Sequence, residues 1–198
     1  MIRLADEEKP QPEAPPSSPV EKALFNARVV MLTGEVNDQQ ARRVTERLFA
    51  LASESEAPIT FVVSSPGGHV ESGDMIHDVI KFIKPRVKML GTGWVASAGA
   101  LIFASVPRQD RFCLPNTRFL LHEPRGGVGG SASDVEIQAR EILRMRERLN
   151  QIFAAATGQP MERIKKDTDR DYWMFPQEAL DYGLVGRIVS SQAELDAA

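Results

Sequence analysis

The sequence is poor in several residue types, and each scarcity excludes a class of protein. A single cysteine, Cys113, leaves no partner for a disulfide within the chain and fits a reducing cytoplasm. No apolar run approaches the roughly 20 residues that a membrane-spanning helix needs. The net charge of −3, without a basic stripe or a platform of aromatic side chains, argues against nucleic acid as a partner. We therefore expect a cytoplasmic protein that binds neither membrane nor nucleic acid.

The first twenty residues differ in composition from the rest of the chain. They carry five prolines and several glutamates, and they show no apolar period. Such a segment buries too little apolar surface to offset the entropy of ordering, so residues 1–20 are expected to be a disordered tail. Their acidic, proline-rich character is not that of a secretory signal. Residues 21–198 are long enough for a sizeable core and are expected to form a single domain.

Apolar patterns in the remaining chain predict alternating strands and helices. Short runs typical of buried strands occur at Val29–Leu32, Ile59–Val63 and Val87–Leu90. Residues 38–51 carry apolar side chains at helical spacing, and Asp38 can cap that helix. Residues 75–83 show a second helical pattern. Strand and helix alternate in this way through residue 105, which favours βαβ units and a mostly parallel sheet.

The stretch from Gly91 to Ala100 places one serine, Ser97, among small residues between a strand-like run and a helix-compatible run. A serine at such a turn can project its hydroxyl into a cleft, and the first N–H groups of the helix then point at whatever the hydroxyl attacks. This is the arrangement that a nucleophilic serine needs. The alternative is that Ser97 only caps the helix, as most serines in this setting do.

A glycine pair follows the strand-like run at 59–63, in Ser64-Ser-Pro-Gly-Gly68. Glycines allow unusual backbone angles and bring bare N–H groups close to a ligand, which suits an oxyanion hole. The alternative is an ordinary turn between a strand and a helix, because proline–glycine pairs mark turns of many kinds.

The chain has three histidines, and a serine hydrolase with a histidine base must use one of them. His122 ends the apolar run Phe119–Leu121 and precedes a Glu-Pro pair, so it is expected at a strand end. His77 falls on the polar side of its helical pattern and is expected at the surface. His69 directly follows Gly68 and remains a rival for the role of base.

An orienting carboxylate is the third requirement, and the segment Asp167-Thr-Asp-Arg-Asp171 offers three aspartates. On charge alone, a solvated cluster at a helix end is an equally good interpretation. Cys113 lies among apolar residues and is interpreted as a core residue rather than a nucleophile. We expect no metal and no cofactor.

The chain resembles the proteolytic subunit of the Clp (caseinolytic) protease. The matching segments are SSPGGHVESGDMIHDVI (64–80), GTGWVASAGALIFAS (91–105), RFCLPNTRFLLHEPRGGVGGSASDVEIQAREIL (111–143) and TGQPMERIKKDTDRDYWMFPQEALDYGLVGRIV (157–189). The resemblance runs from about Val29 to Val189. It implies an α/β, Clp protease/crotonase-like fold of repeated β-β-α type units with a protruding handle helix. It implies these site residues: Ser97 as nucleophile, His122 as base, Asp171 as orienting acid, and the N–H groups of Gly68 and Ala98 as the oxyanion hole.

The handle is expected after the glycine-rich link Gly126–Gly130. A capping box at Ser133–Glu136 would open a long helix that reaches about Ala156. Its apolar stripe consists of Ile142, Met145, Leu149, Ile152, Phe153 and Ala156. This stripe could pack within the core or require a partner chain.

The resemblance favours the partner chain and implies two stacked heptameric rings that enclose a chamber, as a tetradecamer. Asp169 and Arg170 match the ion pair between the rings. A strand near Arg125–Gly130, with Gly67, would bind extended peptide and unfolded protein substrates by strand addition.

An AAA+ unfoldase is the partner that the resemblance suggests, while the sequence departs from the family before its first strand, in the region that in the family helps to receive the unfoldase. The family's Tyr-Asp-Ile-Tyr-Ser-Arg-Leu-Leu stretch is replaced by Pro19-Val-Glu-Lys-Ala-Leu-Phe-Asn26. The resemblance places an apolar docking rim near Val62, Leu90, Phe112 and Leu114. Two other functions compete with the serine endopeptidase: a non-proteolytic structural subunit of a mixed ring, and a crotonase-like acyl-CoA enzyme. The first should have lost a triad residue, and the second needs no serine–histidine pair.

Overall fold

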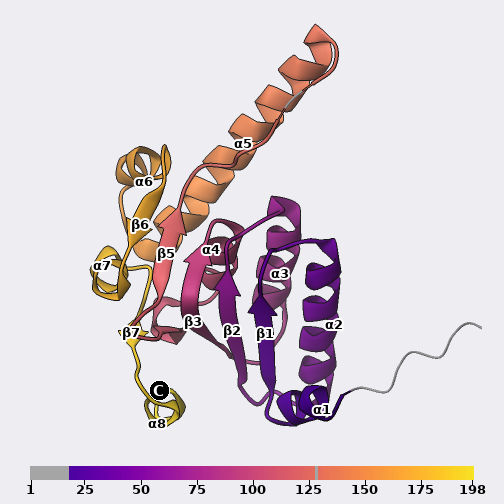
Figure 1. The fold of residues 1–198 in the computed structure, drawn as a ribbon, viewed down its shortest axis with the longest axis vertical. Coiled ribbons are helices and arrows are strands. Elements are labelled where there is room, and N and C mark those ends of the chain that lie inside the picture. The colour runs from indigo at the N-terminus through magenta and orange to yellow at the C-terminus, as the bar shows by residue number, and fades with distance from the viewer. Residues whose placement is uncertain (1–17, 128) are drawn as a thin grey trace, which may run out of the picture.

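The computed structural model describes residues 18–127 and 129–198 and is built around one seven-stranded sheet (Figure 1). The strands are β1 (Val29–Thr33), β2 (Ile59–Ser65), β3 (Val87–Ala96), β4 (Arg111–Cys113), β5 (Arg118–Leu121), β6 (Tyr172–Met174) and β7 (Arg187–Ile188). The helices are α1 (Pro19–Asn26), α2 (Asp38–Glu54), α3 (Val70–Phe82), α4 (Ala98–Phe103), α5 (Ala132–Thr157), α6 (Met161–Thr168), α7 (Pro176–Tyr182) and α8 (Gln192–Asp196), with a 3₁₀ turn at Arg108–Asp110.

The sheet is mostly parallel, as the alternating pattern predicts. Its main order is β1-β2-β3-β4-β7, and each of these pairs is parallel. The long strand β3 changes partner along its length, because its first half pairs with β4 and its last residues pair with β5. β6 then runs antiparallel to β5. The end of β3 is therefore the place where a second, smaller group of strands meets the main sheet.

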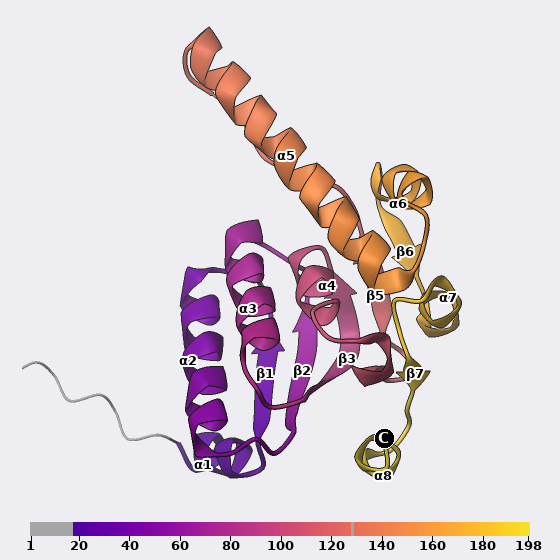
Figure 2. The ribbon, with the colours of Figure 1, turned by 180° about the vertical axis from the view of Figure 1, so that it is seen from behind.

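Helices α2, α3 and α4 cover one face of the main sheet, as the two opposite views agree (Figures 1 and 2). α2 buries Ala41, Val44, Leu48 and Leu51, at the helical spacing expected from the sequence. The cap prediction is wrong by one residue: Asn37 is the N-cap and accepts from the Gln40 amide, while Asp38 is the first helical residue. Either side chain could serve chemically, and the position at which the backbone becomes helical decides between them.

The surface prediction for His77 is wrong, because this side chain is buried in α3. Only 5% of the residue is exposed, and its Nδ1 lies 2.9 Å from the Asp78 carboxylate. The reason is that α3 contacts α4 as well as the sheet. At Gly73 the helices are so close that an added Cβ would lie 3.2 Å from the Ala98 Cβ. Gly73 and His77 lie one turn apart on the side of α3 that faces α4, so His77 is buried, while Glu71, Asp78 and Lys81 remain on an exposed polar side.

The predicted tail ends earlier than residue 20. α1 begins at Pro19, and a capping box between Ser18 and Glu21 closes its first turn, with the Ser18 amide 2.9 Å from the Glu21 carboxylate. The rest of the predicted tail, residues 1–17, lies outside the described residues.

The long helix α5 protrudes from the body as a handle (Figures 1 and 2). It starts at Ala132, with Ser131 and Asp134 as its capping box rather than Ser133 and Glu136. It ends where Gly158 adopts a left-handed conformation at φ 76°. Along the part of the chain that the structure describes, no helix is both long and apolar enough to cross a membrane.

The apolar stripe of α5 is used differently from the expectation. Leu149 and Phe153 are buried inside this chain and belong to its core. The large apolar side chains left exposed lie nearer the tip: Val135 at 36%, Ile137 at 57% and Leu143 at 61%. The base of the handle is thus ordinary core packing, and only the outer part lacks a partner within the chain.

Candidate active site

Ser97 occupies a single-residue turn between β3 and α4, as its sequence context predicts. Its backbone adopts φ 54° and ψ −121°, and in the described part of the chain Arg28 is the only other non-glycine residue with positive φ. Its amide donates to the Leu120 carbonyl at 3.0 Å, which ties the turn to β5. An L-residue held in this region costs about 1–3 kcal/mol, and such residues cluster at functional sites.

Gly67 approaches this turn so closely that no side chain fits there, and the next residue, Gly68, lies equally close to Val36. A Cβ added at Gly67, where φ is 96°, would lie 2.5 Å from the Ser97 Cβ and 3.0 Å from its Oγ. A Cβ added at Gly68, where φ is 145°, would lie 2.2 Å from the Val36 carbonyl oxygen. The glycine pair therefore does more than turn the chain, because Gly67 brings bare backbone against the serine and Gly68 brings it against Val36.

Two backbone N–H groups remain available beside Ser97. The Val36–Gly68 bridge uses the amides of Val36 and His69, which leaves the Gly68 amide without an acceptor among the described residues. Ala98 is the first residue of α4, where no preceding turn of helix can accept from its amide. Such free donors next to a nucleophile are what an oxyanion hole requires.

Strand register brings His122 and Asp171 to the same end of the sheet as Ser97. Ala96 of β3 lies beside Leu120 of β5, so His122 comes just past the strand end, one step beyond Ser97. On the other side, Leu121 pairs with Tyr172 of antiparallel β6. The next pair in that register would be His122 with Asp171, so the two residues come near each other although 49 positions separate them.

The carboxylate of Asp171 is engaged by another residue. Arg125 Nη2 donates to Asp171 Oδ1, and the two groups form an ion pair. The Nδ1 of His122 is buried and has no hydrogen-bond partner within the described residues. Strand register thus places the three predicted triad residues at one end of the sheet. The Asp171 carboxylate pairs with Arg125, a contact that the sequence does not reveal, and no hydrogen bond joins it to the His122 Nδ1 among the described residues.

The surroundings of His122 favour its neutral form. Burial lowers the pKa of this imidazole below its ordinary value of 6.5, and the positive charge of Arg125 lowers it further. Asp171 and Glu123 act in the opposite direction but do not outweigh these effects. A neutral imidazole can accept a proton, so the environment suits a general base.

The other reactive side chains singled out in the sequence are held elsewhere. The Nδ1 of His69 lies 2.8 Å from the Ser72 hydroxyl and 3.2 Å from Asp38, and its Nε2 lies 3.1 Å from Glu71. These contacts tie His69 to α2 and α3. Cys113 is fully buried in β4, as predicted, and burial raises the pKa of its thiol to about 12.

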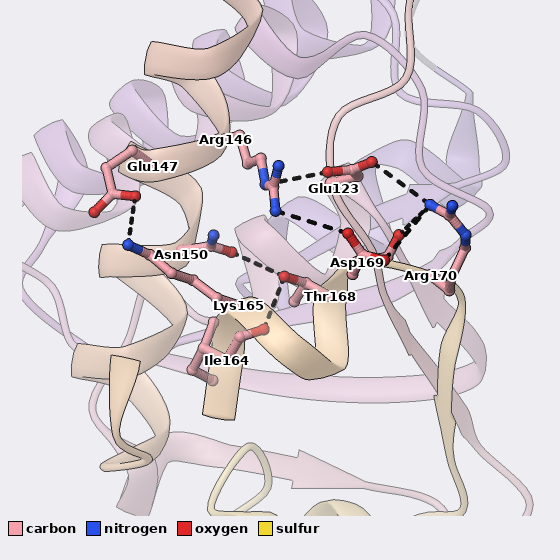
Figure 3. A network of polar contacts seen from close by, with 9 residues as sticks. All are labelled: Glu123, Arg146, Glu147, Asn150, Ile164, Lys165, Thr168, Asp169 and Arg170. Atoms are coloured by element: carbon pink, nitrogen blue, oxygen red, sulfur yellow. Dashed lines mark hydrogen bonds and ion pairs between the residues drawn. The ribbon is translucent and has the colours of Figure 1, made fainter. Parts of the chain in front are cut away.

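Asp169 and Arg170 belong to a charged network directly before Asp171 (Figure 3). Arg146 of α5 contacts Glu123 at 3.1 Å and Asp169 at 3.8 Å, and Arg170 lies 3.7 Å from Asp169. The network joins the handle base, the segment after β5 and the segment before β6. It therefore links the position of Asp171 to the handle.

The buried core of this junction is a second set of hydrogen bonds. The Thr168 hydroxyl lies 3.0 Å from Asn150 Oδ1 and 2.8 Å from the Ile164 carbonyl (Figure 3). The Thr168 carbonyl accepts from the Glu123 amide at 2.7 Å. Thr168 and Asn150 are both almost fully buried. These contacts fix α6 against α5 just before Asp171.

The predicted substrate-binding strand is not a strand within this chain. Residues 122–127 leave β5 in a segment without strand pairing that runs along α5 (Figure 1). The Glu123 amide ties its start to the Thr168 carbonyl, and Arg125, Gly126 and Gly127 are exposed. Residue 128 lies outside the described part. A segment without a neighbouring strand leaves backbone N–H and C=O groups that can pair with another chain.

The predicted docking rim is partly covered by the chain's own C-terminus. Phe112 is only 1% exposed because it packs with Val189 and with Leu195 of α8. Leu90 and Leu114 pack against the same cluster and are half-buried, as is Val62. Lys88 Nζ donates to the Leu195 carbonyl at 3.0 Å and adds a polar tie.

Comparison with known proteins gives a consistent result. The family model described as Clp protease matches residues 15–192. The ATP-dependent Clp protease proteolytic subunit 3 of Rhizobium johnstonii is 59% identical over 190 residues, which are 96% of this chain and 98% of the relative. The ATP-dependent Clp protease proteolytic subunit 2 of Pseudomonas aeruginosa is 56% identical over 171 residues, 86% of this chain and 85% of the relative. The solved structure of ClpP1 from Listeria monocytogenes superposes with a TM-score of 0.81 at 49% identity, covering 89% of this chain and 99% of that one.

Proposed function

This chain belongs to the Clp protease family, a family of serine peptidases, and from that premise we propose that it is a serine endopeptidase subunit. It hydrolyses peptides and unfolded proteins through Ser97, His122 and Asp171. The observation that carries this proposal is the strained backbone of Ser97, which packs against Gly67 and lies beside two free N–H groups. A serine that only caps a helix needs neither the strain nor the glycine pair.

The reaction assigns one step to each group. The Ser97 Oγ attacks the peptide carbonyl carbon while the Nε2 of neutral His122 takes its proton. The amides of Gly68 and Ala98 donate to the oxyanion that forms, which typically accelerates acyl transfer by about 10²–10³-fold for each donor. His122 then gives the proton to the leaving amine. Water, activated by the same imidazole, hydrolyses the acyl-enzyme.

Asp171 has the supporting role in this scheme. When it accepts from the Nδ1–H of His122, it fixes the tautomer that leaves Nε2 free to act as base, and it stabilises the imidazolium. To accept this hydrogen bond, the Asp171 carboxylate must leave its ion pair with Arg125 and turn to His122. The buried, unpartnered Nδ1 marks the place where that hydrogen bond would form.

The proposal extends to assembly and partners. The apolar tip of the handle calls for contact with further copies of this chain, in two stacked heptameric rings, with Asp169 and Arg170 between the rings. Residues 21–198 act as one catalytic domain in this assembly. An AAA+ unfoldase would feed unfolded protein to the chamber, and it would dock near Val62 and the half-buried Leu90 and Leu114.

One observation favours a second candidate function, a structural subunit without proteolytic activity in a mixed ring. Arg125 occupies Asp171, so the hydrogen bond that orients the base is absent within the described residues. A chain fixed in this state would assemble without turning over substrate.

Labelling with a fluorophosphonate probe distinguishes the two functions, since the probe reacts only with an activated serine. We expect one probe per chain, mapped to Ser97, and loss of at least about 10³-fold in labelling rate in Ser97→Ala. Ser53→Ala is the matched control, because Ser53 is an exposed serine of α2 whose hydroxyl, among the described residues, bonds only the Ala50 carbonyl. Absence of labelling in the assembled wild type would favour the structural subunit.

A further inference from the structure

We infer that Arg125 determines substrate specificity by competing with His122 for Asp171, so that peptides with an acidic residue near the cleaved bond activate the site. The inference rests on the proposed function of the same three residues. Arg125 itself takes no part in the chemistry. It acts as a positioning residue, through Asp171.

The Asp171 carboxylate can pair with either of two neighbouring groups, Arg125 or His122. The register of β5 and β6 aligns Asp171 with His122, yet the carboxylate is paired with Arg125. The His122 Nδ1 is left buried without a partner in the described part of the chain. A buried polar atom without a hydrogen bond is unfavourable, so release of Asp171 to His122 would satisfy an atom that now has no partner.

The Arg125–Asp171 ion pair is exposed enough for another carboxylate to replace Asp171. The Arg125 side chain is 62% exposed and that of Asp171 is 43% exposed. Exposed ion pairs contribute little net stability, because both groups are well solvated when apart. A second carboxylate that arrives at Arg125 can therefore replace Asp171 at little cost.

The group that would replace Asp171 at Arg125 is a carboxylate of the substrate. Arg125 lies on the segment without strand pairing that the proposed function uses to bind substrate, and Asp171 is its only ion-pair partner among the described residues. The nearby acid Glu123 is already held by Arg146 at 3.1 Å. The available carboxylate is then a glutamate or aspartate of the bound peptide, which a guanidinium can bind in bidentate fashion.

The exchange has a pH signature. The charged groups that act on His122 are Arg125, Asp171 and Glu123, and Arg125 lowers its pKa. If the Arg125 charge is removed, the pKa of His122 rises, because repulsion is lost and Asp171 becomes available as an acceptor. The base is active only when neutral, so the acid limb of the pH–rate profile moves to higher pH.

The test compares a quenched fluorogenic peptide with a glutamate on one side of its cleaved bond and the same peptide with glutamine there. Both are measured over pH with assembled protein. We expect the wild type to cleave the glutamate peptide about threefold faster or more, the scale set by an exposed ion pair. Arg125→Gln should make the two rates equal by raising turnover of the glutamine peptide, and should move the acid limb upward.

Two further variants keep the test decisive. Arg125→Lys retains the cation and should keep the preference for glutamate, at reduced size. Arg42→Gln removes an exposed arginine of α2 whose only ion-pair partner in the described part of the chain is Glu46, and it should behave as wild type. If hydrolysis depends on Ser97 but the ratio of the two peptides is the same in Arg125→Gln, the inference is wrong and the proposed function stands. If the wild type cleaves neither peptide, the proposed function fails first.

Discussion

At the scale of single residues, the chemistry proposed for Ser97 depends on backbone conformation more than on the hydroxyl itself. The serine adopts positive φ because Gly67 leaves room beside it and because its amide is held by the Leu120 carbonyl. The strain, about 1–3 kcal/mol, is offset by the packing of the surrounding sheet. The site thus depends on the close approach of Gly67 to Ser97, which the structure shows and the sequence motif does not.

Gly67→Ala should remove activity with only moderate loss of stability. The added Cβ would lie 2.5 Å from the Ser97 Cβ, so the serine must move, and a displacement near 1 Å costs about 10²-fold in rate. Peptide turnover and thermal unfolding are to be measured together. Gly158→Ala is the matched control, since Gly158 also has positive φ but an added Cβ meets nothing within 4 Å. It should lose about 1 kcal/mol of stability and keep its activity. Equal turnover in the two variants would show that close approach at Gly67 is unimportant.

The sequence identifies a site residue more readily when the residues that position it lie nearby in the chain. Ser97 and the glycine pair lie in turns of a few residues, so the local sequence singles them out as candidates, while the family resemblance was needed to choose these roles over a helix cap and an ordinary turn. His122 and Asp171 are brought together by strand register, and the family resemblance was needed to choose them. The Arg125–Asp171 pair spans 46 positions and leaves no local pattern. The burial of His77 likewise depends on α4, which packs on α3 from another part of the chain.

At the scale of elements, the strands and helices were predictable because each buries an apolar pattern of its own period. β2 buries alternate residues, as do the first four residues of β1, and α2 buries every third or fourth residue. Helix starts were less predictable, because several polar residues near each start can cap. Asn37 and Ser131 were selected over Asp38 and Ser133 by where the backbone turns, and that position depends on the neighbouring elements.

The handle offers a prediction about assembly. Ile137 and Leu143 are exposed in the isolated chain, so replacing them by glutamate should leave the fold intact and prevent burial in a partner. Burying one such side chain contributes about 1.5–3 kcal/mol, so each substitution should raise the dissociation constant at least about tenfold. Sedimentation at several concentrations measures the shift. Gln138→Glu adds the same charge at an exposed polar position of the handle and should assemble normally. A Leu143→Glu variant as fully assembled as wild type would remove the handle tip from the interface.

At the scale of the whole molecule, the fold joins the site to the surfaces proposed for assembly. Thr168 and Asn150 fix α6 to the handle base, and the network of Arg146, Glu123 and Asp169 adjoins Asp171 (Figure 3). A force on the handle therefore reaches the orienting carboxylate through few contacts. This gives a physical route by which ring contacts could bias Asp171 between Arg125 and His122.

The central claim is that assembled chains hydrolyse peptides by means of Ser97. The direct measurement is fractionation of wild type and Ser97→Ala by sedimentation, with turnover of a short fluorogenic peptide in every fraction and no ATPase present. We predict that wild-type turnover follows the large oligomer, and that Ser97→Ala sediments at the same position with turnover lower by at least about 10³-fold. Turnover that persists in the Ser97→Ala oligomer, or that resides in a 21.9 kDa monomer of the wild type, would contradict the account.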